Sequence, residues 1–488
     1  MEERTKLDRT FKPHWVWAIA LGSSIGWGCF VLPAEWIGTA GPLGAIIGLL
    51  IGALLMMVIS VSYGYMIEKY PVSGGEFAYA YKGFGRNHAF ICGWFLTLGY
   101  ISIVALNASA FSLLFKFTVP SIVKVGYLYE VSGWDVYLGE IVIASLSLLV
   151  FAYFNIRGSQ MSGRLQFIFC VILVAGVVLL AVSMALNPAT EFSNLNPLFK
   201  PGIPAISGIL AIVAIAPWAF VGFDNIPQAA EEFNFSPKKA FGLIIWSLIF
   251  AGSLYALMIV VTSLSIPWQQ LLAGKPVWGT GEVVSGSLGI IGMIMLAISL
   301  CMGVFTGLNG FIVSSSRLMF AMARAKILPS IFAKVHPKYG TPYVGVLFTT
   351  FVCLFAPWFG RQALLWVVDM ASIGVTIAYF YTCFAAFRLM KKDPEATTVK
   401  RGVSMAGAVL GVAFAALLLV PGSPAQLSMP SLIALAVWVG LGGIFYLINQ
   451  KEFSSIPKAE LDYYILGHKP KEKKTSKKRV WLPRETSV

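Results

Sequence analysis

Two short stretches of this sequence combine residue types that could hold a small charged molecule. The first covers residues 22–28, which read Gly-Ser-Ser-Ile-Gly-Trp-Gly in the middle of an apolar segment. Each glycine weakens a helix by about 1 kcal/mol relative to alanine, so a helix is expected to break here. A break at membrane depth exposes N–H and C=O groups, which are tolerated only where they line a cavity or bind something.

The second stretch covers residues 216–227 and carries a proline near each end, a glycine at its centre and one acid, Asp224. An ionisable residue in an apolar segment is costly and is by default a functional candidate. Free N–H groups after the first break suit a carboxylate, and exposed carbonyls of both stretches suit an ammonium. Together the two stretches predict a binding site for a zwitterion such as an α-amino acid. The alternative is that the glycines only allow close helix packing.

The composition shows what must position these stretches. Of the 488 residues, 57% are hydrophobic and 12% are charged, whereas soluble domains are about a quarter charged. Many apolar runs reach the roughly 20 residues that cross a bilayer. We therefore predict an all-α polytopic membrane protein with 12 transmembrane helices. The predicted spans are 14–41, 43–67, 88–115, 136–155, 164–186, 205–231, 239–264, 286–322, 342–358, 361–390, 403–421 and 426–449.

The distribution of positive charge predicts the orientation of these spans. With the N-terminus in the cytoplasm, five of the 36 lysines and arginines fall outside the cell; these are Lys116, Lys124, Lys200, Lys275 and Arg361. Because cytoplasmic loops are enriched in these residues, the chain is expected to be a multi-pass cell-membrane protein with cytoplasmic N- and C-termini. The net charge of +14 therefore needs no nucleic acid partner.

The spacing of the two stretches predicts an internal repeat. They fall in spans 1 and 6, and because five is odd, spans 1–5 and 6–10 have opposite orientations. This is the layout of two inverted repeats, about 14–186 and 205–391, whose broken first helices meet near the bilayer midplane. The predicted parts are an N-tail at 1–13, a ten-helix core at 14–391, helices 11 and 12 at 403–450, and a C-tail at 451–488. Its basic run, 469–479, is expected to be mobile near anionic lipids.

Several motifs, in the same order along the chain, resemble those of the amino acid–polyamine–organocation superfamily. Within this superfamily they are most similar to bacterial amino acid permeases of the cationic amino acid transporter and ethanolamine permease-like branches. They are residues 22–33, 70–79, 220–232, 316–324 and 368–374. The resemblance covers about 14–391. It implies a leucine-transporter-like fold of five plus five inverted helices with two peripheral ones. It also implies secondary active transport of amino acids by alternating access, with the substrate at the unwound centres of helices 1 and 6.

The same resemblance implies which residues hold the substrate. Backbone groups of Ser24 to Gly28 would hold the carboxylate, and carbonyls near Ser24, Trp218, Phe220 and Val221 the amine. Trp218 aligns with an aromatic that closes over substrate in the arginine/agmatine exchanger. Tyr100 and Asn107 lie seven residues apart on nearly one helix face, and either face the site or bond between helices. The candidate substrate-binding residues are Ser23, Ser24, Ile25, Gly26, Trp27, Gly28, Tyr100, Asn107, Trp218, Phe220, Val221, Gly222 and Asp224.

Two departures from the family pattern leave the pocket and the coupling ion open. Trp27 stands where a small residue is usual, so it either shrinks the pocket or points away from it. Leu173 stands where many sodium-independent members carry a lysine. We expect no cofactor and assign no metal site, but the coupling ion could be H⁺ or Na⁺. Thr306 with span 1 carbonyls would suit sodium, Asp224 or Asp369 would suit a proton, and exchange is a third possibility.

Charged residues at the ends of spans 6 and 8 predict a latch. Glu231, Glu232, Arg317 and Arg324 are expected at the cytoplasmic ends. Ion pairs among them could break and reform during alternating access, or they could be fixed structural pairs.

Other classes of function stay open to different degrees. The same fold could carry an amine such as ethanolamine or a polyamine, and a membrane sensor or a subunit of a complex is a further alternative. The 116–135 loop has no cysteine, so no disulfide-linked partner is expected. We predict that the chain is not an enzyme, because no nucleophile–base pair, phosphate loop or metal cluster stands out. The expected partners are a small amino acid or amine and the lipid bilayer.

Overall fold

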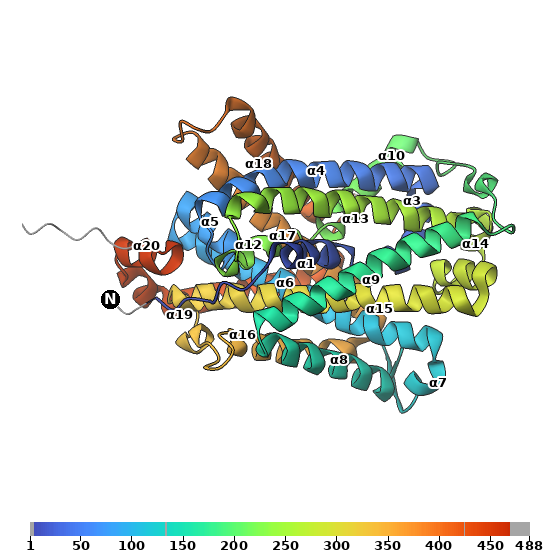
Figure 1. Ribbon diagram of the computed structural model, residues 1–488, viewed down its shortest axis with the longest axis horizontal. Helices are drawn as coiled ribbons and strands as arrows, with labels where there is room; N and C mark the ends of the chain where they lie inside the picture. The colour runs from blue at the N-terminus through green and yellow to red at the C-terminus, as the bar shows by residue number, and fades with distance from the viewer. Residues whose placement is uncertain (1–3, 132–133, 424, 469–488) are drawn as a thin grey trace, which may run out of the picture.

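The chain forms a bundle of long helices that run along one common axis (Figure 1). The computed structural model describes residues 4–131, 134–423 and 425–468. Within this described part, nine helical segments are long and apolar enough to cross a membrane. They are Pro42–Lys69, Arg86–Thr118, Leu138–Ile156, Ser159–Ala185, Pro237–Ser263, Gly279–Arg324, Val368–Met390, Thr398–Leu419 and Met429–Gln450. The chain is therefore a multi-pass membrane protein that is mostly helical, with almost no sheet in the described part.

The first half of the chain contains one interrupted helix followed by four long ones. Its helices are α1 (Pro13–Ile25), α2 (Gly28–Val31), α3 (Pro33–Ala40), α4 (Pro42–Lys69), α5 (Gly75–Phe84), α6 (Arg86–Thr118), α7 (Pro120–Val123), α8 (Leu138–Ile156) and α9 (Ser159–Ala185). A two-stranded antiparallel hairpin, β1 (Tyr127–Val131) with β2 (Trp134–Tyr137), stands between α7 and α8. The sequence analysis did not predict this hairpin.

The second half begins with another interrupted helix. Its helices are α10 (Ala205–Ala214), α11 (Ala216–Ala219), α12 (Asn225–Gln228), α13 (Ala240–Ser263), α14 (Trp268–Ala273), α15 (Gly279–Arg324), α16 (Tyr343–Cys353), α17 (Gly360–Met390), α18 (Thr398–Leu419), α19 (Met429–Ser455) and α20 (Lys458–Leu466). Single 3₁₀ turns lie at Phe192–Leu195, Ala230–Glu232, Pro237–Lys239, Ser330–Ala333 and Ala356–Phe359.

Nine of the predicted spans correspond to the nine long segments, and three are divided. The predicted spans 14–41, 205–231 and 342–358 appear as shorter helices separated by turns. α15 begins before its predicted start and is bent at Gly289, where φ is 60°. The number of spans and their arrangement as inverted repeats stay predictions.

The depth of burial separates central helices from peripheral ones. In α6 and in the Val368–Met390 part of α17, 78% of the apolar window is buried, against 33% in α18 and 11% in α19. Because an apolar helix surface left open by the bundle suits lipid, α18 and α19 offer most of their surface to the bilayer. α1 packs mainly on α13, α9 and α15, and α10 packs mainly on α4.

Both ends of the described chain lie at one end of the bundle, which we call the termini end (Figure 1). α5, α12 and α20 lie there too, and α19 extends into it. Part of the predicted C-tail is therefore helical. The basic run at 469–479 lies outside the described residues.

Candidate functional site

Both interrupted helices are broken at a glycine. α1 ends at Ile25, and Gly26 follows with a φ of 50° before α2 begins at Gly28. In the second break, α11 ends at Ala219 and α12 begins at Asn225, with Gly222 at a φ of 135°. Positive φ angles are strained for residues with a side chain, so glycine is the residue that permits each turn.

The two breaks lie directly against each other. A Cβ added to Gly222 would lie 2.5 Å from the Ser24 nitrogen and 2.8 Å from the Ser24 Oγ atom. The Ser24 hydroxyl donates a hydrogen bond of 3.1 Å to the Phe220 carbonyl. The unwound backbone of span 1 and that of span 6 thus form one contiguous surface.

A tyrosine on α13 joins the two breaks, and sequence reasoning missed it. The Tyr255 hydroxyl lies 2.7 Å from the Ser24 carbonyl oxygen and 2.8 Å from the Ala219 carbonyl oxygen. Its ring is buried against Trp36 and Phe220. Because these carbonyls end helical segments and lack the usual partner, the hydroxyl satisfies groups that the breaks expose. Its signal in the sequence is one tyrosine in an apolar helix, which gives no indication of its partner.

We expect Tyr255→Phe to lower the free energy of unfolding by about 1 to 3 kcal/mol, because it leaves buried carbonyls without their donor. Thermal unfolding of the purified protein in detergent would measure this. The matched control is Tyr153→Phe, since the Tyr153 side chain is 49% exposed. Equal melting temperatures for the two variants would contradict the assigned role.

A small cavity lies between the breaks and the middle of α6. Its volume is about 20 Å³, and residues 23–28 form one wall of it. The remaining lining residues are Ile103, Leu106, Asn107, Trp218, Val221 and Tyr255. A space of this size holds about one water molecule, so the cavity must widen to admit an organic ligand.

Two tryptophans narrow this cavity. Trp27 is 8% exposed and lines it, and its ring centroid lies 6.0 Å from that of Trp218. A Cβ added to Gly28 would lie 2.8 Å from the tip of the Trp218 ring. The bulk of Trp27 therefore shrinks the pocket and does not point away from it. Trp218 is half-buried.

The polar groups facing the cavity are neutral. The Asn107 amide donates 2.8 Å to the Ile103 carbonyl, while its Oδ1 atom accepts no hydrogen bond within the described residues. Gly28 begins the helical run that α2 and α3 continue, so its N–H group has no partner within the helix. The described lining thus offers a free acceptor and helix N–H donors but no charged side chain.

Asp224 and Tyr100 lie behind the cavity and hold the second break in shape. Asp224 is fully buried; its Oδ1 atom accepts 2.6 Å from the Gly222 N–H, and its Oδ2 atom accepts 3.0 Å from the Tyr100 hydroxyl. Neither side chain is part of the cavity lining. Of the two predicted residues on α6, the structure therefore places Asn107 at the cavity and Tyr100 at the turn.

Thr306 and a glutamine that sequence reasoning missed connect α15 to the first broken helix. The Thr306 hydroxyl lies 2.9 Å from the Gly22 carbonyl oxygen. The Gln166 amide nitrogen donates to the carbonyls of Ala18, at 3.1 Å, and Thr306, at 3.2 Å. Leu173, further along the same helix, is buried. A neutral amide on α9 therefore engages carbonyls of both α1 and α15.

Ion pairs close the termini end beneath the second break. Arg317 donates 2.8 Å to Glu232, and both side chains are at most 2% exposed. Ser159 donates to the same carboxylate and accepts from Arg317. Glu231 forms a second cluster with Arg324 and with Arg4 of the N-tail, each at 2.9 Å. The predicted latch residues are thus paired, and Arg4 is an additional member.

The Glu231 cluster is ionised at neutral pH. Burial raises the pKa of Glu231, but the positive charges of Arg324 and Arg4 outweigh it and lower this pKa to about 2. Burial, followed by repulsion from Arg324, lowers the pKa of Arg4 to about 10. Because the carboxyl pKa is depressed, its contribution to stability is complete above its unfolded value and is lost only as the pH falls toward 2.

Asp369, a predicted coupling candidate, is part of neither the cavity lining nor the latch. Its Oδ2 atom accepts 2.6 Å from the Ser431 hydroxyl and 3.2 Å from the Ser428 N–H. Ser428 precedes the first residue of α19. Asp369 thus links α17 to the beginning of a peripheral helix.

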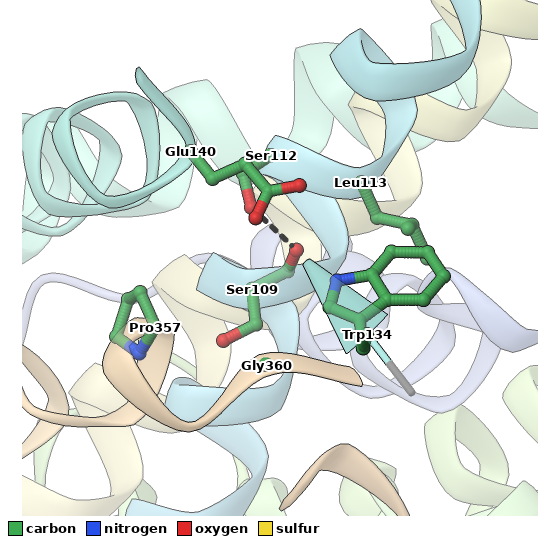
Figure 2. A pocket seen from close by; sticks show the side chains of 7 residues that line it. All are labelled: Ser109, Ser112, Leu113, Trp134, Glu140, Pro357 and Gly360. Atoms are coloured by element: carbon green, nitrogen blue, oxygen red, sulfur yellow. Dashed lines mark hydrogen bonds between the residues drawn. The ribbon is translucent and has the colours of Figure 1, made fainter. Parts of the chain in front are cut away.

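A second small cavity lies between α6, α8 and the β-hairpin (Figure 2). Its volume is about 20 Å³, and Ser109, Ser112, Trp134 and Glu140 are among its lining residues. The Ser112 hydroxyl donates 2.9 Å to the Ser109 carbonyl. Glu140 is paired with Lys116 at 2.5 Å. This cavity is separate from the two breaks.

Comparison with known proteins finds matches over most of this chain. The family model described as amino acid permease matches residues 15–444. The branched-chain amino acid permease of Bacillus subtilis is 27% identical over 90% of this chain and 92% of its own length. The methylthioribose transporter of the same species is 24% identical over 93% and 95%. The mouse cationic amino acid transporter 4 is 27% identical over 78% of this chain and 60% of its own.

Proposed function

We propose, since this chain belongs to the amino acid permease family, that it moves a zwitterionic amino acid by alternating access, with the substrate held between its two helix breaks. Membership of the family supports a transport function. The class of substrate, the site and the mechanism are the proposal. The main observation that supports this proposal is that the cavity between the breaks is lined by uncharged groups.

That lining favours a substrate with no net charge. A cationic amine or polyamine would bring an unbalanced charge into a buried space, and such charges require a carboxylate partner. The predicted acid of the second break, Asp224, is not part of the cavity lining, and its oxygens accept hydrogen bonds from Gly222 and Tyr100. A zwitterion can instead place its carboxylate on the N–H groups that begin at Gly28 and its ammonium on Asn107 Oδ1 and the Phe220 carbonyl.

The apolar part of the lining supports an amino acid with an apolar side chain. Ile103, Leu106 and Val221 line the cavity together with the rings of Trp27 and Trp218. Burying aliphatic groups against such a surface contributes about 0.8 kcal/mol per CH₂. The name of the relative from Bacillus subtilis, a branched-chain amino acid permease, agrees with this class. Substrate binding would turn the Trp218 ring aside and widen the cavity.

The termini end is the side that we propose faces the cytoplasm. The positive-inside rule supports this, because its loops and both tails carry most of the lysines and arginines. In this orientation the pairs Glu232–Arg317 and Glu231–Arg324 close the cytoplasmic side. Alternating access would separate them as α12 moves, and the matched positions of the two breaks support movement about an inverted repeat.

We propose that transport does not use sodium at the contact between α1 and α15. Sodium prefers oxygen ligands, and the Ala18 and Thr306 carbonyls accept from Gln166. The Thr306 hydroxyl also contacts the Gly22 carbonyl. A proton, or exchange of substrates, would then accompany transport.

Uptake of radiolabelled substrates into proteoliposomes tests this proposal. We expect apolar amino acids to enter, and their decarboxylated amines to compete at least about 100-fold less well, because the amines lose the carboxylate contact, worth about 3 kcal/mol for a charged group. Replacing sodium by N-methylglucamine should leave the rate unchanged.

Three results would contradict parts of the proposal separately. Preferential uptake of the amine would support the amine permease instead. Substrate binding without flux would indicate a sensor or a subunit of a complex. Uptake that depends on sodium would overturn the role given to Gln166.

A further inference from the structure

A carboxylate that the proposed site does not use is buried near the termini end. Glu76 lies in the first turn of α5 and is fully buried. Its Oε2 atom accepts a hydrogen bond of 2.5 Å from the Gln228 amide on α12. Its Oε1 atom has no hydrogen-bond partner within the described residues. One oxygen of a buried acid is therefore unsatisfied.

The groups around Glu76 provide no positive charge. The titratable side chains that act on it or feel its charge come from α4, α5, α6, the second break and α17. They are Tyr63, Tyr79, Cys92, Tyr100, Asp224 and Tyr379. The arginines of α15, Arg317 and Arg324, are directed to Glu232 and Glu231 instead. All the groups that face Glu76 are acidic or neutral.

Protonation stabilises a buried carboxylate that lacks both a cation and a full set of hydrogen-bond donors. Removing an unpaired charge from water costs more than binding a proton, so such groups neutralise. Burial, and then the negative charge of Asp224, raise the pKa of Glu76 well above its ordinary value, and they outweigh the lowering effects of its own N–H group, Tyr63 and Gln228. The two acids differ in their partners, because Asp224 has a donor on each oxygen, whereas Glu76 has a donor on one.

Glu76 also lies at the contact that must open. The first residue of α5, Gly75, is packed so closely on α12 that an added Cβ would lie 2.8 Å from the Pro227 Cβ atom. The hydrogen bond from Gln228 joins the same two helices. Separation of α12 from α5 would break this bond and expose the Glu76 carboxyl to water on the termini side.

We propose that Glu76 is the proton-binding group of the transport cycle, protonated on Oε1 while α12 covers it and deprotonated when α12 moves away. The inference rests on the proposed transport function and adds the coupling ion to it. In the forward step the carboxylate takes one proton from water on the side opposite the termini end and forms the neutral acid. In the reverse step the O–H bond breaks and the proton leaves to water on the termini side.

The isosteric variant Glu76→Gln tests this in proteoliposomes. It keeps the shape and an acceptor for Gln228 but cannot exchange a proton. We expect the wild-type protein to accumulate substrate about tenfold for each unit of an imposed pH gradient, as one coupled proton allows. In Glu76→Gln this accumulation should fall to the level reached without a gradient. Exchange of internal for external substrate, which moves no net proton, should persist at about the wild-type rate.

The controls separate the inference from the proposed function. Glu68→Gln changes an exposed carboxylate in the last turn of α4, near the termini end. Substrate accumulation by this variant should match that of the wild type. Glu76→Asp should restore part of the coupling. Accumulation by Glu76→Gln at the wild-type level, or loss of exchange together with coupling, would overturn the inference. The inference would also be overturned if the wild-type protein exchanged substrate but did not accumulate it in response to the pH gradient. Absence of any substrate flux in the wild-type protein would instead contradict the transport function itself.

Discussion

Replacing Gly222 by valine should abolish substrate binding while the protein still inserts into the membrane. The new Cβ would lie 2.5 Å from the Ser24 nitrogen, and the φ of 135° at this position is strained for any side chain. Valine therefore either separates the two breaks or changes the turn, and each outcome removes the surface that holds the substrate. We expect affinity to fall at least about 100-fold, equivalent to about 3 kcal/mol. Equilibrium binding of labelled substrate to purified protein measures this.

Gly242→Val provides the matched control for this substitution. Gly242 lies on α13, and a Cβ added there meets nothing within 4 Å. Its affinity should equal that of the wild type. Gly26→Val should behave like Gly222→Val, because Gly26 makes the other turn, with a φ of 50°. Binding of wild-type strength in both break variants would show that the breaks are not the site.

Removing one partner of the Glu232–Arg317 pair should destabilise the protein more than any other charge substitution at the termini end. Both side chains are at most 2% exposed, so Arg317→Met leaves Glu232 buried without its cation. Loss of one partner of a buried pair costs about 3 to 5 kcal/mol. Ser159, which binds both side chains, would lose one of its partners as well. Thermal unfolding in detergent measures the loss.

The double variant Glu232→Gln/Arg317→Met distinguishes the charge effect from simple loss of packing. Removing both charges should recover most of the stability, because the unpaired charge is then gone. The control is Lys238→Met, which breaks a pair with Glu68 at 3.7 Å between side chains that are 76% and 41% exposed. Its effect should stay within about 0.5 kcal/mol. A double variant as unstable as the single one would contradict the assignment.

The breaks and the charged ends were predictable because each follows from local chemistry. The three glycines Gly22, Gly26 and Gly28 destabilise any helix that contains them. Gly222, which lies between two prolines, has the same effect. Four charged residues at the ends of two spans, Glu231, Glu232, Arg317 and Arg324, can lower their burial cost only by pairing. Such patterns need no knowledge of distant contacts.

The groups that sequence reasoning missed act through contacts distant in sequence. Tyr255 reaches Ser24 across 231 residues, and Gln166 reaches Ala18 across 148. A single polar residue in an apolar helix is equally compatible with several partners, so its sequence position does not identify one. Glu76 lay inside a motif used for the family resemblance, but its burial depends on how α12 covers α5. The pairing of β1 with β2 was missed for a related reason, since a loop of about 20 residues gives little periodicity.

A structure determined with a transported amino acid bound would test the central claim most directly. Cryo-electron microscopy of the protein in lipid nanodiscs, with the best substrate from the uptake assay, would locate the ligand. The account predicts its carboxylate at the N–H groups beginning at Gly28, its ammonium near Asn107 and the Phe220 carbonyl, and a Trp218 ring turned away from Gly28. A ligand bound elsewhere, with the cavity between the breaks still about 20 Å³, would contradict it.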